Sequence, residues 1–339
     1  MTAITYPNAT TTHSFARKQI TVTFFMPGLN GGLDSFTVGE GHAIQATIKH
    51  AGFTTGSEAD LTIRGLSQID RDSLSILPDH PAPDNLNTIT AGQTFITIQA
   101  GDEGSPLTNL FTGTVDSAQT DYDDLNSPFH IHAMTSTIPA SILPQAKGYA
   151  GPQDVITLMA DICKEAGFQL LDHGGWERHA SLTNHYRWGT ALEQIQAILT
   201  ATKGTFNLSP FIPMMESNQG AIPYRGLLEV WGPTFTGIPP AGQESTVPVI
   251  SAATGMIGYP RYSSSGISLT TLLRPDITFW RPLALESTFA PVTGTCTTGT
   301  PPWNGLWLAT FVWHDISTET SHGAWHTHME CIRTTLGRR

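Results

Sequence analysis

The chain has 339 residues, a formal net charge of −11 at pH 7 and only 13% charged residues. A chain of this length buries a sizeable core without disulfides or metals and is long enough for about two domains. The acidic balance excludes a protein that wraps around nucleic acid, because phosphate binding needs a basic surface, whereas an acidic wall lets DNA pass without sticking. Charged residues are about half as frequent as usual, which suits a surface that neighbouring subunits cover.

The three cysteines, Cys163, Cys296 and Cys331, are far apart and odd in number. They imply no disulfide framework and form no CxxC pair, so synthesis in a reducing cytoplasm is the simplest interpretation. Residues 1–19 lack the apolar core of a secretory signal. No stretch approaches the roughly 18 apolar residues of a membrane span, and we therefore expect no membrane insertion.

The first 140 residues alternate as strands do. Strands rich in β-branched and aromatic residues are predicted at 18–25, 42–49, 59–65, 94–100, 109–115 and 128–133. Residues 66–77 are predicted to form a short helix, in which Ile69 belongs to the apolar stripe and which Pro78 ends. Glycine-rich residues 27–33 are expected to be a loop. About six strands at these spacings favour a small barrel or sandwich.

Two amphipathic helices are predicted in the middle of the chain. The first spans 154–167, where Asp154 is the expected N-cap and Gly167 the stop signal. The second spans 190–203, with apolar residues on one face and Gly204 after it. Strands return at 205–208, 227–231, 267–272, 283–287, 306–316 and 324–333, and the last two are predicted to form a hairpin.

Several segments, in this order, resemble the central baseplate hub proteins of contractile phage tails. Residues 41–77, 96–119 and 129–133 resemble the first tube-like domain of that family, in which a strand ending in Ala-Gly precedes a strand of the type LFTGTV. Residues 151–170 and 187–208 resemble its helical insert. Residues 257–287 and 305–333 resemble its closing strands and hairpin. The order and spacing of these motifs extend the resemblance over nearly the whole chain.

The resemblance implies a mostly β (α+β) fold with two tube-like β-barrel domains. The first is expected at 1–145 and the second at 146–339, with the two helices in an insert at about 150–205. It also implies a homotrimer whose barrels form a pseudo-sixfold ring, because three chains with two related domains present six similar edges.

The same resemblance implies a structural virion protein of the tail baseplate and not an enzyme. Such a hub joins the sixfold tail tube to the threefold spike. Its partners are the tail spike protein, the tail tube or tube-initiator proteins and the baseplate wedge proteins. Genome DNA would pass the lumen without specific binding, and the lumen-facing side chains are expected to be acidic or neutral.

A cluster near the C-terminus is the strongest candidate for a site. It consists of His314, Asp315, His322, His326, His328 and Cys331. Alternation on a strand places His326 and His328 on one face and Trp325, Thr327 and Met329 on the other. The spacing matches none of the usual structural zinc patterns, so a polar strand face is favoured over a zinc-dependent structural protein.

Two further groups have simple surface interpretations. His130 and His132 alternate with apolar residues and are expected on a solvent-facing or lumen-facing side. Asp121, Asp123 and Asp124 lack the glycine and glutamate positions of a calcium-binding EF-hand loop and are expected to form an acidic surface turn.

No hydrolase motif is present. GxSxG, HExxH and P-loop patterns are absent. The acidic residues Glu58, Glu103, Glu165 and Glu193 are expected in loops or on helix surfaces and not as a catalytic pair. We therefore expect no catalytic, cofactor-binding or metal-binding residues and no cofactor.

The tryptophans leave one alternative function open. Trp303, Trp307, Trp313 and Trp325 crowd the C-terminal region, where a packed core or subunit interface is favoured over a sugar-binding platform. The alternative function is a carbohydrate-binding or receptor-binding tail protein.

Overall fold

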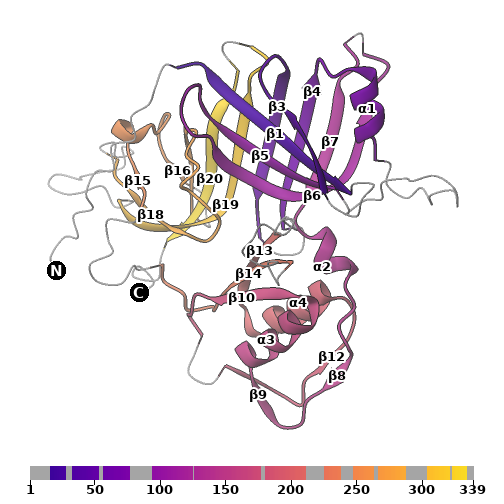
Figure 1. The fold of residues 1–339 in the computed structure, drawn as a ribbon. Coiled ribbons are helices and arrows are strands. Elements are labelled where there is room, and N and C mark those ends of the chain that lie inside the picture. The colour runs from indigo at the N-terminus through magenta and orange to yellow at the C-terminus, as the bar shows by residue number, and fades with distance from the viewer. Residues whose placement is uncertain are drawn as a thin grey trace, which may run out of the picture.

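The fold is seen in a computed structural model (Figure 1). The structure describes residues 16–27, 33–52, 56–76, 94–124, 126–176, 180–210, 225–237, 247–262, 266–287, 304–320 and 323–333. Within them, no helix is long and apolar enough to cross a membrane.

A long sheet dominates the molecule. Its N-terminal strands are β1 (Lys18–Pro27), β2 (Leu33–Val38), β3 (Ala43–His50), β4 (Ser57–Arg64), β5 (Phe95–Asp102), β6 (Thr108–Thr120) and β7 (Phe129–Met134). Its C-terminal strands are β15 (Val249–Ile250), β16 (Arg261–Tyr262), β17 (Ile267–Leu272), β18 (Pro282–Leu285), β19 (Gly305–Ser317) and β20 (Trp325–Arg333). The main path runs β16-β17-β20-β19-β3-β4-β7-β6-β5-β1-β2, and β18 pairs with both β15 and β19.

One strand pairing joins the two groups of strands into this sheet. β19, from the C-terminal hairpin, pairs antiparallel with β3 over Val312–His50 to Ser317–Gln45. We call this pairing the seam. The same strand β19 supplies Val312 to the C-terminal core and Ile316 to the N-terminal core. The two groups therefore bury their apolar side chains on the same face of a shared sheet.

The N-terminal core lies between the strands that cross in Figure 1. Alternate residues of β1, β3, β4, β5 and β7 point into it, for example Val22, Ile48 and Phe129, all fully buried. The helix α1 (Gln68–Leu74) covers one end and is capped by Ser67, whose hydroxyl accepts from the Asp70 amide. This burial of long apolar strands is the main source of stability in the N-terminal group.

A separate α/β unit lies below the sheet in Figure 1. It contains α2 (Thr137–Ser141), β8 (Lys147–Gly148), β9 (Pro152–Asp154), α3 (Val155–Ala166), β10 (Phe168–Asp172), β11 (Ser181–Thr183), β12 (Tyr186–Arg187), α4 (Ala191–Thr202), β13 (Thr205–Pro210) and β14 (Gly226–Trp231). α3 and α4 pack on the small sheet β10-β14-β13 around an apolar core of their own. Asp154 caps α3 and Gly167 ends it with φ of 78°, as its sequence predicts.

The mostly-β prediction is confirmed, and so are both central helices within one residue at each end. Among the described strands, however, neither group closes on itself into a barrel by strand pairing. The division of the chain at 145 and 146 stays a prediction.

One packing prediction for the first helix is wrong. α1 is shorter than expected, and the side chain of Ile69 is 80% exposed instead of joining the apolar stripe. Leu66 lies before the helix, and Leu74 is its last residue. The short helix therefore packs on β6 through Leu74, and this contact leaves Ile69 exposed.

Candidate functional surface on the central sheet

The side of the central strands that faces away from the cores is polar. Strand alternation places on it Gln45, Thr47 and Lys49 of β3, Glu58, Asp60 and Thr62 of β4, His130 and His132 of β7, Trp313 and Asp315 of β19, and His326 and His328 of β20. We call this set the central polar face. It crosses the seam and therefore belongs to both groups of strands.

Register aligns these side chains in rows across five strands. His326, Asp315, Thr47, Asp60 and His132 are directly opposite one another from β20 to β7. Hydrogen bonds connect the row: Thr47 Oγ1 donates to Asp315 Oδ1 over 2.9 Å, and His132 Nδ1 lies 2.8 Å from Asp60 Oδ1. Cross-strand partners of this kind hold side chains in place on a sheet face.

The central polar face is acidic when its histidines are neutral. It carries one lysine, Lys49, against three carboxylates. Lys49 Nζ lies 2.8 Å from Glu58 Oε1 and 3.4 Å from Asp60 Oδ2. The hydrogen bond with Glu58 is the main cause that raises the pKa of Lys49, so this lysine is held by neighbouring carboxylates. Arg64, the next residue of β4 on this side, is paired with Glu319.

An aromatic row lies at the β19–β20 end of the face. The rings of Trp313 and His328 stack with centroids 4.9 Å apart, and Phe311 lies 5.2 Å from Trp313. His328 also lies 3.4 Å from Asp315 and 3.1 Å from the Thr270 hydroxyl. Burial lowers the pKa of His328 despite the nearby carboxylate, which favours its neutral form.

Two histidines lie on the opposite, core-facing side of the seam. His314, 2% exposed, lies 2.9 Å from the Thr327 hydroxyl, and His50 lies 3.0 Å from the Ser57 hydroxyl. Their rings meet edge to face with centroids 5.6 Å apart. Desolvation lowers the pKa of His50 to about 4 and that of His314 well below its usual value. Both rings are therefore neutral at pH 7.

The predicted C-terminal cluster is split by this arrangement. His326, His328 and Asp315 are on the polar side, whereas His314 and Cys331 are on the core side and His322 lies outside the described residues. No group of three or more potential ligands in the described ranges could hold a metal ion. Burial raises the pKa of the thiols of Cys331 and Cys163, so neither is activated as a nucleophile.

The remaining candidates have structural surroundings. Asp121 and Asp124 accept backbone hydrogen bonds within an exposed turn, as expected for an acidic surface turn. His130 is exposed and lies 3.1 Å from the Thr62 hydroxyl. Glu58 lies on a strand, contrary to the prediction of a loop or helix, because β4 extends to residue 57.

The other acidic and aromatic candidates are also placed. Glu103 follows β5, Glu165 pairs with the buried Arg187, and Glu193 completes the capping box of α4. Trp307 is buried in the C-terminal core, as a packed-core role requires. Trp313 and Trp325 are half-buried, and Trp303 lies outside the described residues.

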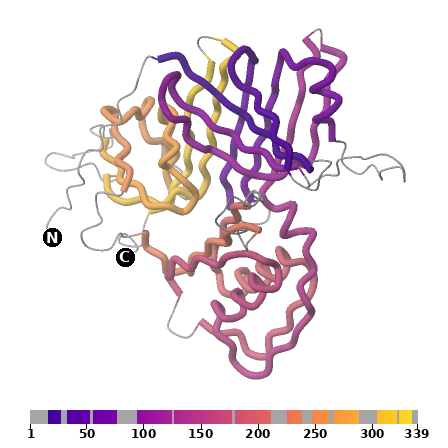
Figure 2. Tube along the Cα trace, viewed as in Figure 1, coloured from indigo at the N-terminus to yellow at the C-terminus, as the bar shows by residue number. Residues whose placement is uncertain are grey.

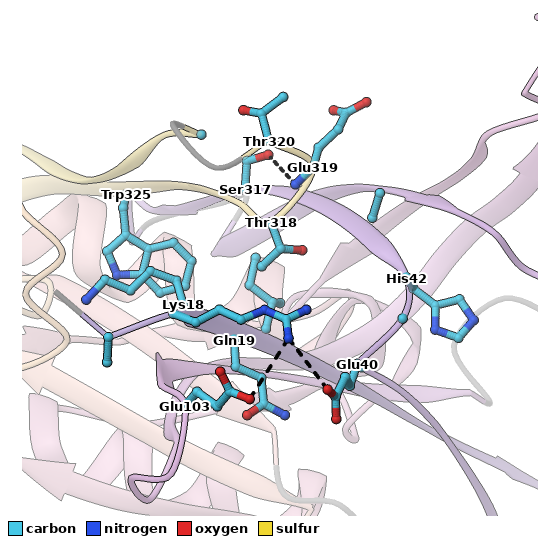
Figure 3. Close-up of a pocket in the computed structure, with 17 residues that line it drawn as sticks. Lys18, Gln19, Glu40, His42, Glu103, Ser317, Thr318, Glu319, Thr320 and Trp325 are labelled. Carbon is cyan, nitrogen blue, oxygen red and sulfur yellow. Dashed lines mark hydrogen bonds and ion pairs between the residues drawn. The ribbon is translucent and has the colours of Figure 1, made fainter. Parts of the chain in front are cut away.

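Two hollows border the face. A trough of about 350 Å³ lies over β3, β4, β6 and β7 and is lined by Thr47, Asp60, His130 and His132 among others. A larger pocket of about 800 Å³ lies where the β19–β20 turn meets the starts of β1 and β3 (Figure 3). In it, Arg17 lies 3.6 Å from Glu40 and 3.9 Å from Glu103, and these side chains are well exposed. Exposed pairs of this kind are weak and mark no catalytic centre.

No protein-family model and no curated protein matches this sequence. Among solved structures, the tail protein from Neisseria meningitidis MC58 is similar with a TM-score of 0.51 at 9% identity, over 94% of this chain and 96% of that one. The 43 kDa tail protein of prophage MuSo2 from Shewanella oneidensis has a TM-score of 0.49 at 10% identity, over 93% of this chain and 97% of that one. A chain of the Francisella PdpA-VgrG complex has a TM-score of 0.48 at 9% identity, over 94% of this chain and 58% of that one. The fold of the chain is thus similar to that of the Neisseria tail protein, and a tail-protein fold is what the sequence resemblance implied.

Proposed function

We propose that the chain is a structural hub of a phage-type tail, three copies of which form a ring around a channel. In this proposal the hub joins the sixfold tail tube to the threefold spike. It contacts the tail tube or tube-initiator proteins on one side, the spike on the other and wedge proteins around the rim, and it resides in the baseplate of a contractile tail. The protein acts through geometry and carries no catalytic residues.

The observation that carries the proposal is the central polar face. The sheet continues across the seam (Figure 2). Its central strands turn a largely polar side away from two apolar cores. The wall of a channel requires continuity of this kind. In the proposed ring, the two strand groups of each chain would present six edges around a threefold axis.

The charge of the face supports the passage of DNA without binding. One lysine among three carboxylates gives a surface that repels phosphate. The lysine is paired with Glu58 and Asp60, so it offers little attraction to a passing polyanion. A channel wall of this composition conducts DNA with little friction.

The first experiment is the molar mass in solution, by size-exclusion chromatography with light scattering, alone and with the spike protein encoded beside it. We expect a mass near three times the 36.6 kDa of one chain in at least one of the two samples. A monomer in both would overturn the hub. A ring of three would then be imaged to locate the central polar face.

A second experiment tests the channel wall separately. Wild-type protein is expected not to bind double-stranded DNA at about 0.15 M salt, while the triple variant Gln45→Lys, Thr47→Lys, Thr62→Lys binds it measurably by fluorescence anisotropy. The matched control places lysines at the exposed Ser181, Thr183 and Thr200 of the α/β unit. Equal binding by both triple variants would contradict a special role for the face.

One observation favours the alternative, a carbohydrate-binding or receptor-binding tail protein. Tyr186 and Trp188 of the α/β unit are 62% and 70% exposed, and Leu143 is 75% exposed. Contiguous exposed apolar patches mark binding surfaces. Binding on a glycan array that Trp188→Ala abolishes would establish this function, and the absence of any signal would remove it.

A further inference from the structure

The strand assembly carries exposed apolar side chains at two opposite ends. One end consists of α1 and residues 121–124 and 126–127, where Ile69 is 80% and Tyr122 is 66% exposed; we call it the α1 end. The other consists of residues 251–262, where Ile257 is 41% and Tyr259 is 61% exposed; we call it the η2 end, after its short 3₁₀ helix η2 (Ala252–Thr254). α1 and β16 lie at opposite sides of the upper body in Figure 1.

Hydrogen bonds hold the elements of the α1 end in fixed positions. Gln68 Nε2 donates to the Tyr122 hydroxyl over 3.3 Å, and Arg71 Nη1 donates to the Ser127 carbonyl over 3.1 Å. These bonds hold the helix against the turn. Leu74 anchors the helix in the core below, so Ile69 is displayed outward beside Tyr122 on a fixed frame.

The η2 end is equally well held. The Ile257 amide donates to the Thr270 carbonyl over 2.8 Å, and the Leu272 amide donates to the Gly255 carbonyl over 2.9 Å. This segment therefore runs along β17 and leads into β16, the last strand of the sheet path. A short terminal strand presents backbone groups to a neighbour, and such edges are normally covered.

The two ends have opposite charge. The α1 end carries one arginine, Arg71, and the carboxylates Asp70, Asp72, Asp121, Asp123 and Asp124. Residues 251–262 contain one charged side chain, the exposed Arg261. Apolar groups ringed by complementary charges are the features of a specific interface.

We propose that the α1 end of one subunit binds the η2 end of the next copy of this chain, and this inference rests on the proposed ring. Ile69 and Tyr122 would pack against Ile257 and Tyr259, with Arg261 facing the aspartates. Because the two surfaces differ, the contact is heterologous, and a head-to-tail contact of this kind generates a closed ring when its rotation fits.

The test uses Ile69→Glu and Ile257→Glu, which change exposed side chains that the folded subunit does not need. We expect each variant to stay folded and to raise the concentration at which half of the protein is assembled by about tenfold or more, a loss of one apolar anchor. Leu143→Glu, which adds the same charge at the exposed Leu143 of the α/β unit, is the matched control and should assemble as wild type.

Mixing the two variants distinguishes a head-to-tail contact from a symmetric one. In the mixture, the intact α1 end of the Ile257→Glu variant can bind the intact η2 end of the Ile69→Glu variant. A two-chain species should therefore form that neither variant forms alone. Oxidation of the double variant Ile69→Cys, Ile257→Cys should also give covalent dimers and trimers that the single cysteine variants do not give.

The outcomes separate this inference from the proposed function. If wild type and both glutamate variants are trimeric at equal concentration, the assigned interface is wrong while the ring stands. If Leu143→Glu disrupts assembly as much as the others, the assignment also fails. If wild type is monomeric alone and with the spike, and the double cysteine variant gives no covalent oligomer, both the ring and the interface are overturned.

Discussion

The N-terminal and C-terminal groups of strands share one sheet but are stabilised differently. In the N-terminal group, strands of six to thirteen residues bury alternate apolar side chains in one large core. In the C-terminal group, β15 and β16 have two residues each and β18 has four. Such short strands contribute few ladder hydrogen bonds and little apolar surface. The short strands at this end, unlike the long β19 and β20, therefore need contacts beyond strand pairing.

A buried arginine supplies such contacts. The side chain of Arg274 is 1% exposed and donates to the carbonyls of Val249 and Thr254, each over 3.2 Å. It also forms two hydrogen bonds with the carboxylate of Asp276, of 2.8 and 2.6 Å. One guanidinium thus fastens β15, η2 and the segment after β17 together. The comparison shows that short strands and irregular structure at one end of a sheet are held by polar contacts in addition to their apolar core.

The largest effect is expected from Arg274→Met, which keeps the volume but removes every donor. The Thr254 carbonyl loses its arginine donor and the Val249 carbonyl keeps only the Thr254 hydroxyl. With the bonds to Asp276 also lost, we expect the free energy of unfolding to fall by about 3 to 5 kcal/mol. Urea unfolding followed by tryptophan fluorescence measures it. Arg17→Ala, at a well-exposed arginine, is the control and should change stability by less than about 0.5 kcal/mol. A loss below about 1 kcal/mol for Arg274→Met would show that the short strands are stable without the hydrogen bonds of Arg274.

Much of this fold follows from the sequence, but the sheet order does not. The long strands β1, β3, β7 and β20 lie where alternation predicts them. β2 was not predicted, because LDSFTV alternates weakly and is fixed by its pairing with β1. β10 was missed for the same reason, since its parallel pairing with the distant β14 has no local signal.

The candidate surface was partly predictable. Alternation correctly places His326 and His328 on a polar side, away from Thr327. It gave no sign that β19 pairs with β3 to make the polar face continuous. The sequence pattern did not single out His50. It placed His314 in the C-terminal cluster, although His314 lies between the apolar Val312 and Ile316 on the same side of the strand. That position indicates burial.

The second prediction concerns the seam, where the two groups depend on each other. The pKa of His50 is about 4 when folded and about 6.5 when unfolded, so below pH 6.5 the unfolded chain binds more protons. Stability is therefore complete above pH 6.5 and falls as the pH drops toward 4, by up to about 3 kcal/mol for His50, with a further loss from His314. Urea unfolding at pH 7.5, 6.0 and 5.0 measures this slope.

The control for the seam is the double variant His50→Gln, His314→Gln. It should be less stable at pH 7.5 but should lose less stability between pH 7.5 and 5.0 than wild type. The paired carboxylates Asp161 and Glu229, whose pKa values are lowered, lose stability only in a more acidic range and do not obscure this window. An unchanged slope in the double variant would locate the acid sensitivity elsewhere.

The third prediction tests the point where the α/β unit meets the seam. Gly52 has φ of 62°, and a Cβ there would lie 2.3 Å from the Phe279 ring and 2.9 Å from the Phe206 carbonyl oxygen. Gly52→Ala combines a left-handed backbone with displacement of a packed ring, so we expect a loss of about 2 kcal/mol in unfolding free energy. Gly104→Ala, also at positive φ but with open space around its Cβ position, is the matched control and should cost about 1 kcal/mol.

The smallest effect is expected on the central polar face. Lys49→Gln removes the contacts with Glu58 and Asp60, yet the Lys49 side chain is 34% exposed and solvent screens both pairs. We expect a loss below about 1 kcal/mol that shrinks further at 0.5 M salt. Lys147→Gln, which removes the exposed pair with Asp161 on the α/β unit, should behave alike. A loss as large as that of Arg274→Met would mean that the face stabilises the subunit. A small loss shows that the core side of the sheet supplies the stability, so the residues of the polar side are free to line the proposed channel.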